Sequence, residues 1–328
     1  MPHREGGADP YASQVEGLLL ISNAGAGTNE DDAVAEAVEV LREKYDVEQV
    51  ATEDEDELED VLKKSGDRVV AVAGGDGSLH AVVNALWRLR RLEKTRLGLI
   101  PLGTGNDFAR GAGIPLEPAD AARVVNAGDS VAIDLVVDDC DRVIVNNAHL
   151  GIGADASRSA LKWKPRMGKV GLGRLGYAIG ALSAGLRPDF IYAKVTIDGK
   201  LIDRPHRLAQ VAIGNGPDVG GGTELIPGAD PTSGRITVIV SRAVGPWSRL
   251  GYMLRLRGGS HHLMKEVEQL QGSKVEVEGD EFYLSADGEV TGPHTHMSWE
   301  LRPDAVRMFL PGRGLAAESE PGAEASEA

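Results

Sequence analysis

Short apolar runs that end at glycine-rich turns constrain the fold of this chain more strongly than any other feature of its sequence. The runs that predict strands cover residues 17–22, 47–52, 68–73 and 97–101. Segments with the apolar spacing of helices lie between and after them, at residues 30–44, 57–64 and 78–92. Continuous apolar strands that alternate with helices are typical of a parallel sheet covered on both faces. We therefore expect an α/β domain with a doubly wound parallel sheet over residues 17–130.

Three turns rich in glycine directly follow predicted strands. They are residues 23–27 (NAGAG), 74–78 (GGDGS) and 101–110 (PLGTGNDFAR). The carboxyl ends of parallel strands in an open α/β sheet face one crevice, where ligands bind. Glycine lets the backbone approach a phosphate closely, and the N–H groups at the start of a helix bind anions. Any one of these turns could serve only to reverse the chain, but the three together favour a phosphate-binding site.

Two familiar nucleotide-binding motifs are excluded. The P-loop pattern G-x-x-x-x-G-K-[ST] does not occur in the sequence. The pattern G-x-G-x-x-G occurs once, at residues 171–176 (GLGRLG), but it follows a basic segment where the dinucleotide-binding fold requires a buried strand. The phosphate site that we expect therefore belongs to neither of these classes.

Strands predominate in the sequence after residue 130. They are predicted over residues 131–137, 141–146, 191–197, 208–213, 234–240, 274–277 and 281–285. Only two helical stretches interrupt them, at residues 172–186 and 247–268. Strand-rich sequence without regularly alternating helices indicates a mostly antiparallel fold. We expect a β-rich C-terminal sandwich domain over residues 131–295.

Composition and charge exclude several classes of protein. The formal net charge of −15 argues against a nucleic-acid-binding protein, which carries a basic footprint. The sequence has no apolar run long enough to span a bilayer, and its polar N-terminus does not resemble a signal peptide. The single cysteine, Cys140, suits a reducing compartment, so we expect a cytoplasmic protein. Residues 1–16 and the small, acidic residues 313–328 are expected to be disordered.

Two carboxylates flank a glycine near the end of the chain, at residues 286–289 (ADGE). Residues two apart in a strand or turn can project to the same side, so Asp287 and Glu289 could serve one site. One could hold Mg²⁺ while the other accepts a proton from a hydroxyl nucleophile. The alternative is the ordinary Asp-Gly turn of a β-hairpin, and the pattern alone favours that alternative.

The strings at residues 74–78, 101–110 and 287–289 (DGE) together resemble the diacylglycerol kinase catalytic-domain family, which includes sphingosine kinases and bacterial lipid kinases. Residues 23–27 and 145–156 (VNNAHLGIGADA) are similar to further segments of that family. The resemblance extends from about residue 17 to residue 312. The GGDG string alone is weak, because NAD kinases share it, but the GTGNDFAR string with a distant DGE is specific.

The resemblance implies a two-domain lipid kinase with ATP and Mg²⁺ in the cleft between its domains. Diacylglycerol, which would give phosphatidic acid, is the first expectation for the lipid substrate. The family's catalytic base falls on Glu289, with Asp287 beside it, and Asp76 belongs to its Mg²⁺–phosphate network. Residues 296–312 would return to the nucleotide-binding domain. The nucleotide contacts fall on Asn23, Gly25, Gly27, Thr52, Gly74, Gly75, Gly77, Ser78, His80, Gly103, Thr104, Asn106 and Asp107.

One departure from the family concerns a second metal site. Some bacterial members place a metal-binding aspartate where this chain has Ser233. A hydroxyl cannot replace the charge of a carboxylate toward Mg²⁺, which argues against this second metal site, although Asp230 lies close by as a candidate ligand.

Two basic segments are the sequence features that suit a lipid surface. Residues 156–187 carry seven Lys and Arg and no acid, and residues 242–265 carry five, interleaved with Trp247 and several leucines. Basic residues favour an anionic membrane surface, and Trp and Leu favour shallow insertion into it. We expect transient, peripheral contact with anionic membranes. Two solvated helix faces are the alternative.

Two other functions stay open at this point: an NAD kinase, and a catalytically silent regulator that binds nucleotide or lipid. The sequence also leaves the oligomeric state open, with a homodimer among the arrangements that it allows.

Overall fold

The computed structural model describes residues 15–23, 28–152 and 190–312, with side chains from residue 32 onward in the second range. Several predictions therefore fall outside the described residues. They concern Gly25, Gly27, the string at 171–176, the helix expected at 172–186 and the two ends expected to be disordered, of which only residues 15 and 16 are described. No helix among the described residues is long and apolar enough to cross a membrane.

The first part of the chain, which we call the parallel region, is a sheet with the strand order β2-β1-β3-β4. All neighbouring strands in this set run parallel. Their bounds are β1 (Glu16–Asn23), β2 (Tyr45–Thr52), β3 (Val69–Gly74) and β4 (Arg96–Pro101). The central strand β3 is buried at every position, which explains its unbroken apolar sequence.

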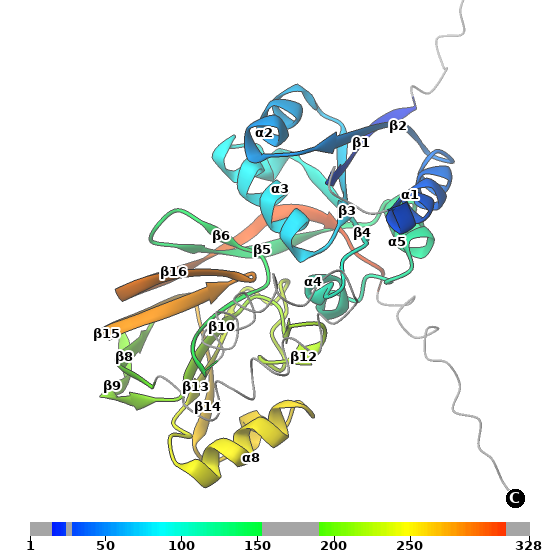
Figure 1. Cartoon of the computed structure of the whole chain (residues 1–328). Helices are drawn as coiled ribbons and strands as arrows, with labels where there is room; N and C mark the ends of the chain where they lie inside the picture. Colours follow the sequence, from blue (N-terminus) through cyan, green and yellow to red (C-terminus); the bar gives the residue numbers. More distant parts are fainter. Residues whose placement is uncertain (1–14, 24–27, 153–189, 313–328) are drawn as a thin grey trace, which may run out of the picture.

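Helices cover both faces of the parallel region. In Figure 1, α2 and α3 lie on one side of the sheet and α1 and α5 on the other. The helices are α1 (Thr28–Leu41), α2 (Glu55–Lys64), α3 (Asp76–Arg88), the short α4 (Asp107–Gly111) and α5 (Pro118–Ala127), with a 3₁₀ turn at Leu92–Lys94. The doubly wound α/β fold is thereby confirmed.

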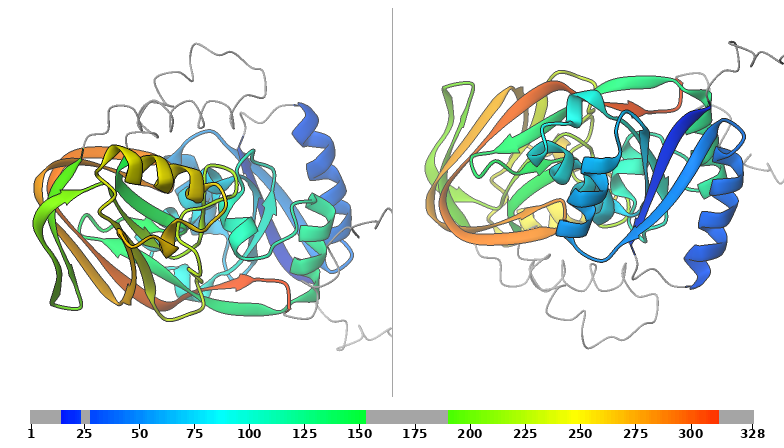
Figure 2. Two further views of the ribbon diagram at one scale, coloured as in Figure 1. Left: turned by 90° about the horizontal axis from the view of Figure 1, so that it is seen from below. Right: turned by 90° about the horizontal axis from the view of Figure 1, so that it is seen from above.

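The second part, the antiparallel region, forms the order β14-β13-β10-β7-β15-β16, with the hairpin β8–β9 paired to β15. A core of alternating buried side chains joins these strands, and Figure 2 shows them beside the parallel region. The β-rich C-terminal sandwich is confirmed. Its strands are β5 (Ser130–Asp138), β6 (Val143–Ile144), β7 (Asn147–Gly151), β8 (Ile191–Ile197), β9 (Lys200–Leu208), β10 (Gln210–Gly214), β13 (Ile236–Ser241), β14 (Val267–Gly272), β15 (Lys274–Ala286) and β16 (Glu289–Phe309), and a two-stranded ribbon pairs β11 (Asp218–Val219) with β12 (Thr223–Glu224).

The long strand β16 joins the two regions. Its first half pairs antiparallel with β15, and its last residues pair parallel with β4 through Arg307 and Met308. The turn between β15 and β16 consequently lies on the same continuous sheet as the glycine turns of the parallel region. A movement of this turn relative to those glycines requires deformation of paired strands.

Several predicted elements were wrong in extent. The helix expected over 247–268 ends as α8 (Pro246–Leu256), because Gly258 and Gly259 follow it and Gly259 has φ 63°. The residues after these glycines form a 3₁₀ turn (His261–Leu263) and strand β14. The polar strand β9 was missed because, at the edge of the sheet, it pairs only with β8 and exposes much of its length.

Candidate active site

Two of the glycine turns are in direct backbone contact. A Cβ atom added to Gly103 would lie 2.6 Å from the Cα of Gly75, and one added to Gly75 would lie 3.0 Å from the Cα of Gly103. The N–H of Leu102 donates to the carbonyl of Gly74 at 3.0 Å, which holds the turns together. Only glycine fits at this approach, so the sequence leaves bare backbone at the carboxyl ends of β3 and β4.

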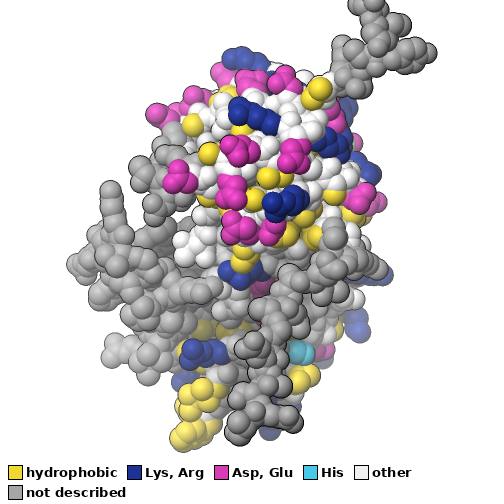
Figure 3. Space-filling model, turned by 90° about the vertical axis from the view of Figure 1, so that its right-hand side faces the viewer, with side chains coloured by type: hydrophobic (Ala, Val, Ile, Leu, Met, Phe, Trp, Pro, Cys, Tyr) yellow, Lys and Arg dark blue, Asp and Glu magenta, His cyan; other side chains and the backbone are white. Residues whose placement is uncertain are grey.

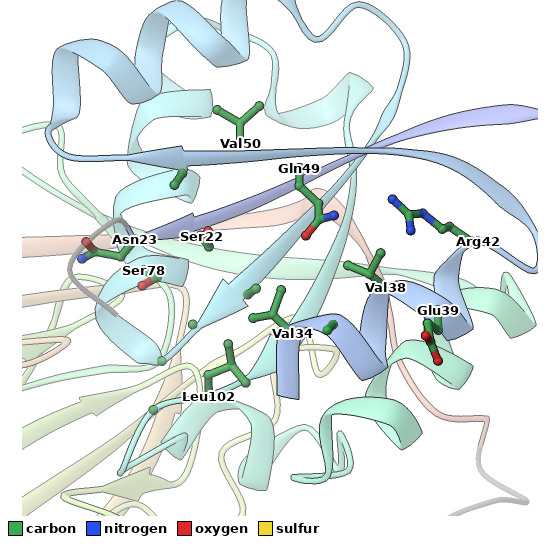
Figure 4. Close-up of a pocket in the computed structure, with 16 residues that line it drawn as sticks. Ser22, Asn23, Val34, Val38, Glu39, Arg42, Gln49, Val50, Ser78 and Leu102 are labelled. Carbon is green, nitrogen blue, oxygen red and sulfur yellow. The ribbon is translucent and has the colours of Figure 1, made fainter. Parts of the chain in front are cut away.

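A cavity of about 760 Å³ opens beside these turns. Its lining includes Ser22 and Asn23 from the end of β1, together with Gly75, Ser78 and Gly103. Figure 4 shows Asn23 and Ser78 near one another and Arg42 in a different part of the lining. Helix α3 begins here without a side-chain cap from the described residues, so the N–H groups of its first turn remain available to an anion.

Thr52 lies at a smaller cavity on the other side of Asn23. This cavity of about 200 Å³ is lined by Asn23, Thr52, Gly77 and Ser78, among others. The ends of β1 and β2 and the first turn of α3 therefore converge, as the strand order predicts.

The contact between Gly75 and Gly103 supports a prediction about stability. Gly103→Ala is expected to lower the free energy of unfolding by about 1–3 kcal/mol, because its methyl group meets backbone that cannot rotate away. Gly77→Ala is the matched control, since nothing lies within 4 Å of its added Cβ and alanine favours the helix. Urea denaturation compares the two. Equal stability of both variants would contradict the close packing of these turns.

Asp76 connects the two glycine turns. Its carboxylate accepts hydrogen bonds from the N–H of Phe108 at 2.9 Å and of Asp107 at 3.0 Å, at the start of α4. Asn106, just before α4, has φ 51° and donates from Nδ2 to the carbonyl of Gly103 at 2.7 Å. These contacts fix the GTGND string against the GGDG string. Thr104, by contrast, is exposed.

Negative charge is concentrated around Asp107. Its carboxylate is buried and accepts from the N–H groups of Gly221 and Gly222, each at 2.8 Å. Burial raises the pKa of Asp107, and the charge of Asp76 raises it further. Burial, Asp107 and Glu224 raise the pKa of Asp218 to about 6. A divalent cation would relieve this repulsion, and carboxylates are the oxygen ligands that Mg²⁺ prefers.

The Asp-Gly turn at the other side of the site is a β-hairpin turn that also belongs to the site. Asp287 and Gly288 have φ 45° and 89°, as a two-residue turn between β15 and β16 requires. The Asp287 side chain is 2% exposed and accepts from the N–H groups of Val145 (2.7 Å), Asn146 and Asn147 (both 3.0 Å). Its oxygens are therefore occupied, whereas Glu289 lies exposed.

His80 of α3 links the parallel region to this turn. Its Nδ1 lies 3.0 Å from Oδ2 of Asp287. Burial lowers the pKa of His80, but the hydrogen bond and charge of Asp287, with the charge of Glu289, outweigh burial and the opposing Arg142, so the pKa is raised. One turn along α3, Asn84 makes a paired contact with the backbone of Val143, at 2.9 and 3.0 Å.

The contact between His80 and Asp287 has a defined pH dependence. A raised histidine pKa means that the contact stabilises the fold below the ordinary pKa of about 6.5 and that this stabilisation is lost as pH rises through the raised value. His80→Gln is therefore expected to cost more stability at pH 6 than at pH 9, as measured by thermal unfolding. His262→Gln serves as the control. If His80→Gln lowered the stability equally at both pH values, the charged form of His80 would contribute nothing to the stability of the fold.

A pocket of about 210 Å³ brings the two regions together. Asp76 and Asp107 line it from the parallel region, and His149, Asp287 and Gly288 line it from the antiparallel region. His149 is fully buried, and burial lowers its pKa to about 4, so this residue is neutral. Neither His149 nor Asp218 was predicted as a site residue: His149 lies within the family-like string that ends at residue 156 but was given no role there, and Asp218 lies in none of the strings. The run of glycines at 220–222 was the one signal for the loop that contacts Asp107.

In the structure, the Asp230 side chain makes local hydrogen bonds to Thr232. Its Oδ1 accepts from the N–H and hydroxyl of Thr232, at 2.8 and 2.7 Å. Within the described ranges, Asp230 belongs to no group of three carboxylate, histidine or cysteine ligands that could share an ion. A metal at Asp230 stays a prediction without support from this geometry.

Comparison with protein families matches two models to this chain. The diacylglycerol kinase catalytic domain matches residues 17–137, and the YegS C-terminal NAD kinase beta sandwich-like domain matches residues 147–310. A "Probable lipid kinase YegS-like" protein of Serratia proteamaculans is 33% identical over 217 residues, which cover 65% of this chain and 68% of that protein. One from Pseudomonas putida is 29% identical, covering 77% and 80%.

Solved structures share the fold. One, described as "A putative diacylglycerol kinase from Bacillus anthracis str. Sterne", superposes with a TM-score of 0.73 at 22% identity, covering 91% of this chain and 98% of that one. Another, described as a diacylglycerol kinase from the same organism, gives a TM-score of 0.68 at 18% identity, covering 91% and 98%.

Proposed function

The chain belongs to the diacylglycerol kinase catalytic-domain family of lipid kinases, and from that membership we propose that it transfers the γ-phosphoryl group of ATP to diacylglycerol, giving phosphatidic acid. The observation that carries the proposal is the pocket shared by Asp76, Asp107 and the Asp287–Gly288 turn. This pocket is lined both by Asp76 at the start of α3 and by the turn next to Glu289, which supports binding of phosphate and acceptor side by side. The NAD-kinase alternative is not retained, because the relatives are described as lipid kinases.

The proposal assigns nucleotide binding to the cavity beside the glycine turns. The bare backbone at Gly75 and Gly103 fits a triphosphate, as does the start of α3, which no side chain in the described part of the chain caps. Mg²⁺ would neutralise phosphate charge, and Asp76 and Asp107, which line the pocket between the two regions, would supply carboxylate charge near it. The proposal also includes the division of the chain into a nucleotide-binding domain over 17–130 with 296–312 and a lipid-substrate domain over 131–295.

In the proposed chemical step, the parallel region holds the nucleotide and the β15–β16 hairpin supplies the base. The acceptor hydroxyl oxygen forms a bond to the γ-phosphorus, the bond from that phosphorus to the β,γ-bridging oxygen breaks, and ADP leaves with those electrons. Glu289 accepts the hydroxyl proton, which suits an exposed carboxylate on a fixed hairpin. Asp287 and His80 hold the hairpin in place through their mutual contact and take no proton from the acceptor.

The acceptor lies in a bilayer, so the proposal includes transient contact with an anionic membrane surface. Of the two basic segments that suggested this contact, residues 156–187 lie outside the described residues. Residues 242–265 are described, and they include α8.

Transfer of label from [γ-³²P]ATP to a total lipid extract, with identification of the product, tests the proposed function. We expect labelled phosphatidic acid, formed only with Mg²⁺ present. Parallel reactions with sphingoid base and NAD identify other acceptors. Label in a different lipid would overturn the choice of diacylglycerol, and no transfer to any lipid would support the silent regulator.

A further inference from the structure

Helix α8 presents an apolar face to solvent, at the end of the molecule opposite the parallel region (Figure 1). Trp247 is 83% exposed, Leu250 49% and Leu254 66%, and Leu263 just beyond the helix is 73% exposed. Helical spacing places Trp247, Leu250 and Leu254 on one face. We call these four side chains the α8 patch.

The opposite face of α8 is fixed to the protein core. Tyr252 is buried there, and its hydroxyl donates to Oε1 of Gln210 at 3.0 Å. Its ring also packs edge-on against that of His261, with centroids 5.2 Å apart. The α8 patch therefore cannot turn inward without breaking buried contacts, and its exposure is a property of the folded helix.

Basic residues lie beside the α8 patch, although the whole chain has a net charge of −15. Residues 246–265 contain Arg249, Arg255, Arg257 and Lys265 and no acidic residue. Arg249 packs over the ring of Phe190, and the carboxylate of Glu224 lies beside Gly259, so Arg255, Arg257 and Lys265 are the cations that we assign to the surface. The acids that follow face cations: Glu266 lies 3.9 Å from Lys265, and Glu268 lies 2.7 Å from Arg242. On the face shown in Figure 3, hydrophobic side chains with some Lys and Arg lie toward the lower end, and most of the visible acidic side chains lie toward the upper end, where further Lys and Arg are interspersed.

We infer that the α8 patch and its basic residues form a docking surface for an anionic phospholipid bilayer. Trp and Leu side chains suit the boundary between headgroups and acyl chains, and Lys and Arg add attraction to anionic lipid. One short helix with two arginines, followed by Arg257 and Lys265, gives weak, reversible attachment, as an enzyme that visits its substrate requires. The inference rests on the proposed function only in expecting the acceptor to lie in a membrane.

Flotation with vesicles, without nucleotide or diacylglycerol, tests the surface separately from catalysis. We expect binding to vesicles of phosphatidylglycerol and phosphatidylcholine, and much weaker binding to phosphatidylcholine alone. One variant combines three substitutions: Arg255→Gln, Arg257→Gln and Lys265→Gln. We expect its affinity for anionic vesicles to be about 100-fold lower, at about fivefold for each charge removed. Arg123→Gln, an exposed cation on α5, is the matched control and should bind like the original protein.

The apolar part of the surface has its own variants. The double variant Trp247→Ser, Leu254→Ser is expected to bind anionic vesicles at least about tenfold more weakly. Leu201 is an exposed leucine on β9, and Leu201→Ser should leave the affinity for vesicles unchanged. Anionic vesicles should shift the tryptophan fluorescence to the blue in the original protein and not in Trp247→Phe. Unchanged melting temperatures would show that the variants fold.

Three results would overturn the inference: equal binding to neutral and anionic vesicles, patch variants that bind like the controls, or patch variants that alter only the oligomeric state in sedimentation. Activity separates this inference from the proposed function. Patch variants should keep full activity on dispersed short-chain diacylglycerol and lose it on diacylglycerol in vesicles. Vesicle binding without transfer to any acceptor would remove the proposed function and leave the docking surface intact.

Discussion

Glu289→Gln is expected to lower the rate of phosphoryl transfer by about 10²- to 10⁴-fold, because the amide cannot accept the proton of the acceptor hydroxyl. The affinity for ATP should change little, since Glu289 does not line the cavity beside the glycine turns. Single-turnover transfer from labelled ATP measures the first quantity, and titration with a fluorescent ATP analogue measures the second.

Glu281→Gln is the matched control for this variant. Glu281 is also an exposed glutamate of the β15–β16 hairpin, but it lies on β15, away from the turn that carries Glu289. We expect Glu281→Gln to transfer phosphate at the original rate. If Glu289→Gln did the same, Glu289 would have no role as a base.

Asp287→Ala is expected to lower the free energy of unfolding by about 3–5 kcal/mol and to abolish transfer. The substitution leaves three backbone N–H groups and His80 without their acceptor in a buried place, at about 1–3 kcal/mol for each group that finds no other partner. It also puts alanine at a positive φ. Urea denaturation measures the stability of the variant, and the transfer assay measures its activity.

The chain contains a matched control for Asp287. Asp198 and Gly199 form another two-residue turn, between β8 and β9, with φ 48° and 75°. The Asp198 carboxylate accepts from the N–H groups of Ser273 and Lys274 at 2.9 and 2.8 Å, but these contacts are exposed. Asp198→Ala should therefore cost less stability and leave transfer unchanged. If Asp198→Ala lowered the free energy of unfolding more than Asp287→Ala does, the buried role that we give to Asp287 would be contradicted.

The parts of the fold that local sequence determines were predicted well. The strands of the parallel region are short apolar runs, and the two glycine turns that the structure describes in full follow β3 and β4 directly, so pattern and structure agree there. The helix predicted over 247–268 was too long, because apolar spacing alone does not show where glycines end a helix. Strand β14 was missed: its first two residues fell within that predicted helix, and no element was predicted for its last four. Strand β9 was missed because an exposed edge strand lacks the apolar run that marks a buried one.

The motif residues of the candidate site were found from sequence, but several of their contacts were not. The strings GGDGS, GTGNDFAR and DGE led to Asp76, Asp107 and Asp287, which line one pocket. Their hydrogen bonds join residues far apart in the chain, such as Asp107 with Gly221, and no local pattern predicts such pairs. Asp287 was expected beside the base, and the structure shows in addition that its carboxylate is fully engaged with backbone N–H groups.

A crystal structure with Mg²⁺ and a non-hydrolysable ATP analogue tests the central claim most directly. The claim is that the backbone at Gly75 and Gly103 holds the triphosphate while the hairpin after β15 directs Glu289 toward the γ-phosphate. We expect the phosphates over the start of α3, with room for one acceptor oxygen between the terminal phosphorus and the Glu289 carboxylate. A triphosphate bound elsewhere, or a Glu289 side chain that cannot reach that oxygen, would contradict the claim.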